Sequence, residues 1–176
     1  MTGLVFRVGI IGPESSGKST LARYLAKRYK GVLVPEYARE FVERKGTTDV
    51  TWDELCEIAR HQIEGMRGLE DERIRGLEDE WIRGLEEPVF FDTELIVTKV
   101  WFEYAFHKVP EWLNEAIQRY PMDVYLLTYP DLPWEQDGAR YNGSDEIRME
   151  LFERYEQEIQ ALDIPYYIIR HTDSEI

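Results

Sequence analysis

The chain has 176 residues, 43% of them hydrophobic and 32% charged, a composition that fits one globular domain and excludes collagen, general disorder and disulfide scaffolds. Its 35 acidic residues outnumber its 21 lysines and arginines, and the resulting net charge of −14 disfavours nucleic acid as a partner. The lone cysteine, Cys56, and the absence of any apolar run long enough to span a membrane predict a cytoplasmic protein.

Short apolar runs alternate with helical patterns along the whole chain. The first strand is expected at residues 4–11, and the helix after it at residues 19–30. Thr51 and Glu54 form a capping box that opens a further helix at Trp52. The remaining strands are expected at residues 32–34, 89–91, 124–127 and 166–169, and the remaining helices at residues 37–44, 94–106 and 145–162. This alternation predicts a single α/β domain over residues 1–176 with a five-stranded parallel sheet.

Two segments interrupt this pattern. Residues 129–143, rich in proline, glycine and aromatic side chains, have the length and composition of a functional loop, and we interpret them as a lid that brings Arg140 to a bound ligand. Residues 67–87 repeat the unit RGLEDERI with a period of eight. We expect this repeat to project as a helical hairpin or partly mobile segment, broken at glycines such as Gly65 and Gly68, far from the ligand site.

The sequence GPESSGKST, residues 12–20, matches the phosphate-binding P-loop pattern G-x-x-x-x-G-K-[ST] between a strand and a helix. Its glycines allow turns that a side chain would block, and its backbone N–H groups cradle phosphate oxygens. Lys18 would neutralise the β- and γ-phosphates of ATP, and the hydroxyl of Ser19 would bind Mg²⁺. The residues expected to bind ATP are Gly12, Glu14, Ser15, Ser16, Gly17, Lys18, Ser19 and Thr20.

Two carboxylates follow strands at the edge of the sheet where ligands bind in parallel α/β proteins. Asp92 ends the run PVFFD and could hold Mg²⁺, although it could equally cap the next helix. Glu36, in the run PEYAR, could accept hydrogen bonds from a sugar or a proton from an attacking alcohol. Arg39, one helical turn further on, could bind Glu36 or a phosphate. Which carboxylate acts as the base stays open at this point.

The motifs GPESSGKST, PEYAREFV, FFDTE and PWEQDGAR, in this order over residues 8–141, resemble the ribosylnicotinamide kinase domain of NadR-type NAD-biosynthesis proteins. The resemblance implies a three-layer P-loop nucleoside and nucleotide kinase fold. It also implies transfer of the γ-phosphoryl group of ATP to the 5′-hydroxyl of nicotinamide riboside. It places Lys18, Glu36, Asp92 and Arg140 in catalysis. It further suggests Glu36, Tyr37, Arg39 and Trp134 as substrate contacts, in which the aromatic rings stack on the pyridinium.

The chain also departs from this family. The P-loop begins at residue 12 and no H-x-G-H motif occurs, so we expect neither an adenylyltransferase activity nor a DNA-binding role. No N-K-x-D guanine reader occurs, which argues against a GTPase. Two alternative functions stay open: a kinase for another nucleoside or nucleotide, and a sensor that binds ATP without turnover. Whether the chain forms a homo-oligomer also stays open. The expected partner is a small nucleoside, with no membrane involved.

Overall fold

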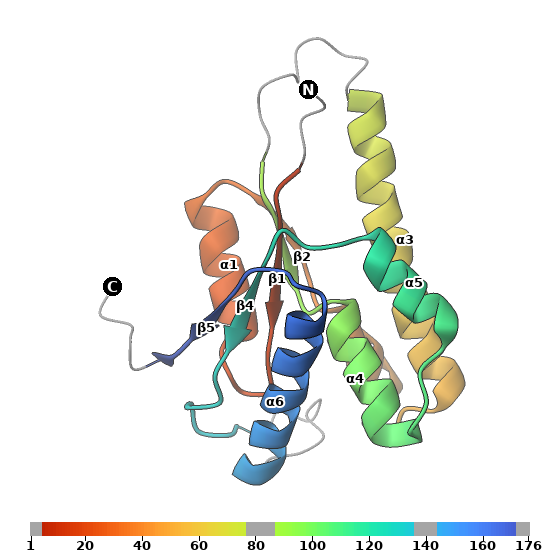
Figure 1. The fold of residues 1–176 in the computed structure, drawn as a ribbon, viewed down its shortest axis with the longest axis vertical. Coiled ribbons are helices and arrows are strands. Elements are labelled where there is room, and N and C mark those ends of the chain that lie inside the picture. Colours follow the sequence, from red (N-terminus) through yellow and green to blue (C-terminus); the bar gives the residue numbers. More distant parts are fainter. Residues whose placement is uncertain (1–4, 77–86, 136–143, 172–176) are drawn as a thin grey trace.

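The computed structural model describes residues 5–76, 87–135 and 144–171. Strands and helices alternate over these ranges (Figure 1). The strands are β1 (Arg7–Ile11), β2 (Val32–Val34), β3 (Val89–Asp92), β4 (Val124–Thr128) and β5 (Tyr166–Ile169). The helices are α1 (Lys18–Arg28), α2 (Tyr37–Lys45), α3 (Trp52–Gly76), α4 (Leu95–Phe106), α5 (Glu111–Arg119) and α6 (Asp145–Ala161). Every predicted strand is therefore present, and α5 is a helix that the sequence interpretation missed.

The five strands form one parallel sheet in the order β2-β3-β1-β4-β5. Strand β1 lies at the centre, where Gly9 is in register with Phe91 of β3 and Tyr125 of β4. All carboxyl ends therefore meet at one edge of the sheet, which is the lower edge in Figure 1. This arrangement confirms the expected α/β class, and it brings the segments after β1, β2 and β3 together.

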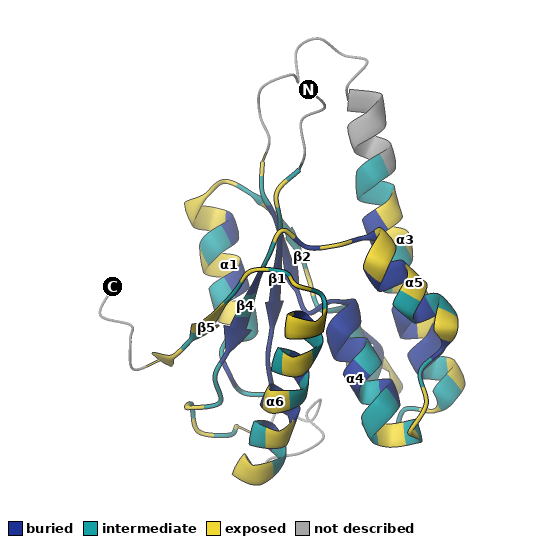
Figure 2. Ribbon diagram, in the orientation of Figure 1, coloured by how far each residue is buried: buried dark blue, intermediate teal, exposed yellow. Residues whose placement is uncertain are grey.

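Helices cover the two faces of the sheet unequally (Figures 1 and 2). On one face, α1 packs Ala22 and Ala26 against Val8, Ile10 and Phe90. On the other face, α3, α4, α5 and α6 enclose a larger core with the sheet. Helix α4 is buried over most of its length, as its almost uniformly apolar sequence predicts. These layers hold the loops at the carboxyl edge on a rigid base.

Side-chain caps fix the beginnings of two helices where the sequence predicted them. At α3, the amide N–H of Thr51 donates to the carboxylate of Glu54 at 2.8 Å, and the amide N–H of Glu54 donates to the Thr51 hydroxyl at 3.3 Å. This is the reciprocal capping box. At α6, the hydroxyl of Ser144 accepts from the amide N–H of Ile147 at 3.2 Å.

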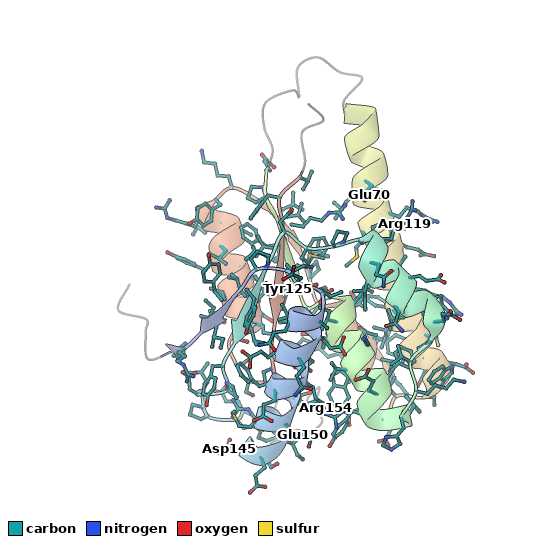
Figure 3. All side chains as sticks on the ribbon, in the orientation of Figure 1. Glu70, Arg119, Tyr125, Asp145, Glu150 and Arg154 are labelled. Atoms are coloured by element: carbon teal, nitrogen blue, oxygen red, sulfur yellow. The ribbon has the colours of Figure 1, made fainter. Side chains whose placement is uncertain are left out.

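The first repeat unit lies within α3, which runs without interruption through Gly65 and Gly68 to Gly76. The expectation that these two glycines break the helix is therefore wrong, and residues 77–86 lie outside the described ranges. The guanidinium of Arg7, at the start of β1, binds the carboxylate of Glu70 at 2.9 Å. Figure 3 accordingly shows Glu70 in the upper part of the molecule and Asp145 at the lower end, toward which the strands run. Within the described helices, none is both long and apolar enough to cross a bilayer.

Candidate active site

The P-loop passes so close to the end of β4 that only glycine fits at its first position. Gly12 has a φ of 153°, and a Cβ there would lie 2.2 Å from the hydroxyl oxygen of Thr128. Ser16 then anchors the loop, because its buried hydroxyl donates to the carbonyl of Pro13 and hydrogen-bonds the hydroxyl of Thr128, both at 2.6 Å. The loop is therefore held against the sheet before any ligand arrives.

The beginning of α1 is built to accept an anion. Gly17 is the N-cap residue, with a φ of 81°, and no side chain caps the first turn. The amide N–H groups at the start of α1 therefore remain available for phosphate oxygens. Lys18 stands in the same turn, and its ammonium group donates to the carbonyl of Pro13 at 2.7 Å. The ammonium group of Lys18, which the sequence predicts to neutralise phosphates, therefore lies next to the P-loop backbone.

A cavity of about 970 Å³ opens from the P-loop at the carboxyl edge of the sheet. Its other walls come from the segment after β2, from α2, from residues 48–58 at the beginning of α3, from the end of β3 and from the C-terminal half of α4. It brings together these predicted site residues: Glu14, Ser15, Ser16, Gly17, Lys18, Ser19, Thr20, Glu36, Arg39 and Asp92. Its volume is that of a small-molecule site, and it is large enough for a nucleoside.

Glu36 lies close enough to Asp92 and to Lys18 to interact electrostatically with both. Desolvation is the largest influence on Glu36 and raises the pKa of its carboxyl, which Lys18 and Arg39 lower and Asp92 and Glu14 raise. Asp92 is 6% exposed, and its Oδ1 atom has no hydrogen-bond partner among the described residues. A buried carboxylate oxygen without a partner is costly unless a cation or a donor binds it. Asp92 and the hydroxyl of Ser19 therefore fit a Mg²⁺ site.

One wall of the cavity is aromatic and comes from α4, which the sequence interpretation did not place at the site. Trp101, Tyr104 and Phe106 line it, and the rings of Trp101 and Tyr104 meet edge to face with centroids 5.7 Å apart. The indole N–H of Trp101 also hydrogen-bonds the hydroxyl of Tyr155. These contacts hold an aromatic surface in the lining of the cavity. In the sequence, Trp101 and Tyr104 are three residues apart and so share one face of a helix. That spacing is as typical of a helix buried in the core as of one that lines a cavity.

Two residues expected to stack on the acceptor lie elsewhere. The ring of Tyr37 is already stacked on that of His61, with centroids 3.5 Å apart and planes 7° apart, and it does not line the cavity. In the structure the Tyr37 ring therefore packs against another part of the protein, and its stacking on an acceptor stays a prediction. Trp134 is half-buried outside the cavity lining. Arg140 lies outside the described residues, so its lid role stays a prediction.

Comparison with known proteins agrees with this fold. The NadR trifunctional NAD biosynthesis/regulator protein of Escherichia coli is 24% identical over 94% of this chain, which spans 38% of that relative's length. A solved NadR structure in complex with NR covers 97% of this chain and 46% of its own, with 24% identity and a TM-score of 0.64. Thymidylate kinase from Ehrlichia chaffeensis, at 12% identity, covers 97% of this chain and 91% of its own, with a TM-score of 0.62.

These likenesses show the fold of P-loop nucleotide kinases, with the phosphate-binding loop at the centre of the sheet. They do not extend to the acceptor, because the two solved structures share the architecture while their sequences diverge from this chain. A family model described as AAA domain matches residues 7–175. Since that match takes in both the P-loop and every described strand, the chain belongs to the AAA domain family.

Proposed function

We propose that the protein is an ATP-dependent kinase that transfers the γ-phosphoryl group to the 5′-hydroxyl of nicotinamide riboside. The observation that supports it best is the lining of the cavity. Six acidic side chains (Glu14, Glu36, Glu40, Glu43, Asp49, Asp92) and three basic ones (Lys18, Arg23, Arg39) line it among the described residues. An aromatic wall and an excess of carboxylates suit an acceptor with a cationic ring, and they disfavour an acceptor that already bears a phosphate.

The proposed roles follow from position. The P-loop N–H groups and Lys18 bind and orient the phosphates of ATP. Glu36, whose raised pKa makes it a better proton acceptor than an ordinary glutamate, takes the proton of the attacking hydroxyl. Ser19 and Asp92 would hold Mg²⁺, whose positive charge would offset the negative charge of the phosphate oxygens. Trp101 and Tyr104 stack on the pyridinium ring, and Arg140 remains the predicted lid cation.

The similarity to NadR supports the same acceptor. One solved relative is described as NadR in complex with NR, and another as NadR in complex with NAD and AMP-PNP. The strongest competing function is another nucleoside or nucleotide kinase, because thymidylate kinase shares the fold at a similar TM-score. An ATP-binding sensor without turnover is the third candidate.

The test is release of ADP from ATP and Mg²⁺ with four acceptors: nicotinamide riboside, thymidine, deoxyadenosine and thymidine monophosphate. We expect nicotinamide riboside to give the highest kcat/KM, with its 5′-phosphate as product. If thymidine or the monophosphate is turned over with a tenfold higher kcat/KM, the acceptor is wrong. Binding of ATP without turnover of any acceptor would favour the sensor.

A variant pair ties the activity to the P-loop. Lys18→Ala removes one preorganised cation from the transferring phosphoryl group and should lower kcat/KM about a hundredfold, a loss of about 3 kcal/mol. Lys27→Ala removes an exposed lysine from the same helix and should leave kcat/KM unchanged. The melting temperature of both variants should stay close to that of the parent chain.

A further inference from the structure

Arg148 is the largest fully buried side chain in the described part of the molecule, with 1% of its surface exposed. It stands in the first turns of α6, in the acid-rich sequence DEIRMELFER, where an arginine would ordinarily face solvent. A buried cation is costly unless its donors are satisfied. The groups that accept hydrogen bonds from the Arg148 guanidinium therefore indicate the role of this side chain.

Three of the four hydrogen bonds that Arg148 makes to described residues go to backbone carbonyls. The Nε atom donates to the carbonyl of Glu14 at 3.1 Å, and Nη2 donates to the carbonyls of Ser15 at 3.2 Å and Leu132 at 2.8 Å. The Nη1 atom donates to the carboxylate of Asp145 at 3.1 Å, on a side chain that is 91% exposed. Four of the five N–H groups of the guanidinium are thus used by the protein itself. The side chain is engaged with the P-loop and does not stand open to a phosphate.

These bonds determine which way the P-loop peptides face. In a trans peptide the carbonyl and the following N–H point in opposite directions. Because Arg148 holds the carbonyls of Glu14 and Ser15, the N–H groups of Ser15 and Ser16 face away from it. Ser15 also has a φ of 54°, a left-handed conformation that a non-glycine residue seldom adopts. Such a residue inside a turn lets successive N–H groups converge on one anion.

The same guanidinium fastens the P-loop to the segment after β4. Its bond to Leu132 is its shortest, and Ser15 adds a second link, because the amide N–H of Glu135 donates to the Ser15 hydroxyl at 3.1 Å. Residues 132–135 belong to the described part of residues 129–143, the segment expected to act as a lid. One buried side chain therefore bridges α6, the P-loop and the beginning of that connection.

We propose that Arg148 is a positioning residue for ATP that acts through the backbone of the P-loop. It holds the N–H groups of Ser15 and Ser16 toward the phosphate site and fixes the loop relative to residues 132–135. The inference rests on the nucleotide-binding part of the proposed function and is independent of the acceptor.

Equilibrium binding separates this role from a general contribution to stability. Arg148→Gln and Arg148→Lys are compared with the parent chain for binding of Mg²⁺–ATP and of adenosine, which has no phosphate. Both variants should bind ATP at least tenfold more weakly while their affinity for adenosine changes less than twofold. Lysine keeps the positive charge, but its single ammonium group lacks the planar set of donors with which the guanidinium reaches three carbonyls. Arg148→Lys should therefore not restore ATP binding.

Two control variants complete the test. Leu151→Ala leaves a cavity one turn along α6, at a side chain that is 3% exposed, and should lower the melting temperature without changing the ratio of ATP to adenosine affinity. Arg119→Gln removes an exposed arginine on α5 and should change neither. A readout at steady state is the KM for ATP, which should rise in the Arg148 variants while the KM for the acceptor does not.

Several results would overturn the proposal. These are ATP affinity within twofold of the parent chain in both variants, an equal loss of ATP and adenosine binding, full restoration by lysine, or the same ratio change in Leu151→Ala. If Arg148→Gln does not fold, Arg148→Lys decides on the same criteria, and failure of both to fold assigns Arg148 to folding alone. A panel without any kinase turnover would refute the proposed acceptor and leave this binding ratio intact.

Discussion

Asp92 has an unfavourable buried environment in the free protein that its proposed role in binding Mg²⁺ would explain. Its buried Oδ1 atom, without a hydrogen-bond partner in the described structure, destabilises the free protein unless a cation binds it. Asp92→Asn should therefore lower kcat about a hundredfold and raise the Mg²⁺ concentration needed for tight ATP binding, without lowering the melting temperature. Glu115→Gln, at an exposed acid on α5, is the control. An unchanged Mg²⁺ requirement in Asp92→Asn would remove this carboxylate from the metal site.

Glu94, two residues further on, predicts a pH dependence of stability. Desolvation raises the pKa of Glu94 to about 8 from 4.5, against the lowering effect of hydrogen bonds from Ile96, Leu95 and Tyr125. Because the folded protein holds a proton that the unfolded chain releases near pH 4.5, this group stabilises the fold fully below that pH. Its contribution is lost as the pH rises toward about 8, by about 1.4 kcal/mol per pH unit.

Glu94→Gln should remove most of this dependence, since the amide does not titrate. The measurement is the free energy of unfolding in urea at pH 6 and pH 9 for the parent chain and the variant. The variant should be the more stable of the two at pH 9. Parallel pH profiles for the two proteins would show that Glu94 is ionised in the fold across this range.

At single residues, the sequence predicted what a local pattern encodes and missed what the tertiary fold assembles. The P-loop follows from adjacent residues, so Lys18 and Ser19 could be assigned from spacing alone. Arg148 could not, because three of its partners are backbone carbonyls, two of them more than a hundred residues earlier and one in the loop after β4. Trp101 faced the same limit, since a tryptophan in an apolar helix is compatible with a core position as well as with a cavity wall.

Among the elements, α3 gives the clearest test of helix energetics. Gly65 and Gly68 lie inside the helix, and a Cβ built at either position meets nothing within 4 Å. Glycine in a helix interior costs about 1 kcal/mol relative to alanine. Gly65→Ala and Gly68→Ala should therefore each stabilise the protein by about 1 kcal/mol in urea unfolding and leave kinase activity unchanged. A loss of stability in either variant would mean that α3 bends at that glycine in solution.

The elements themselves were largely predictable, for reasons that differ between them. Strands β2 and β5 match the predicted residues because their short apolar runs have clear ends: Gly31 and Pro35 flank β2, and Pro165 precedes β5 while the charged Arg170 follows it. Helix α5 was missed, although Leu113, Ala116 and Ile117 have helical spacing and Pro110 stands at its N-cap. Conversely, the glycines of α3 suggested a break that does not occur, because tertiary contacts along the helix outweigh a local cost of about 1 kcal/mol each.

For the molecule as a whole, the repeat should be dispensable if it is removed in whole units. Deleting residues 67–82 places RGLEE directly after Met66, so a leucine and a glutamate again occupy the sequence positions of Leu69 and Glu70. Arg7 binds Glu70 and is in register with Val89, the first residue of β3. The shortened α3 would therefore end close to the point where β3 begins. Activity should stay within about tenfold. A deletion variant that is well folded by circular dichroism yet inactive would place the repeat in the site.

The central position of β1 also has a consequence during synthesis. Its neighbours in the sheet are β3 and β4, whereas β2, the next strand to be made, lies beyond β3 at the edge. The apolar residues of β1 therefore leave the ribosome about 80 residues before their first pairing partner does, which at 5–20 residues per second is roughly 4 to 16 s. During that interval the nascent chain exposes an unpaired hydrophobic strand to which chaperones can bind. Each repeat unit inserted between β2 and β3 lengthens the delay between the synthesis of β1 and that of β3.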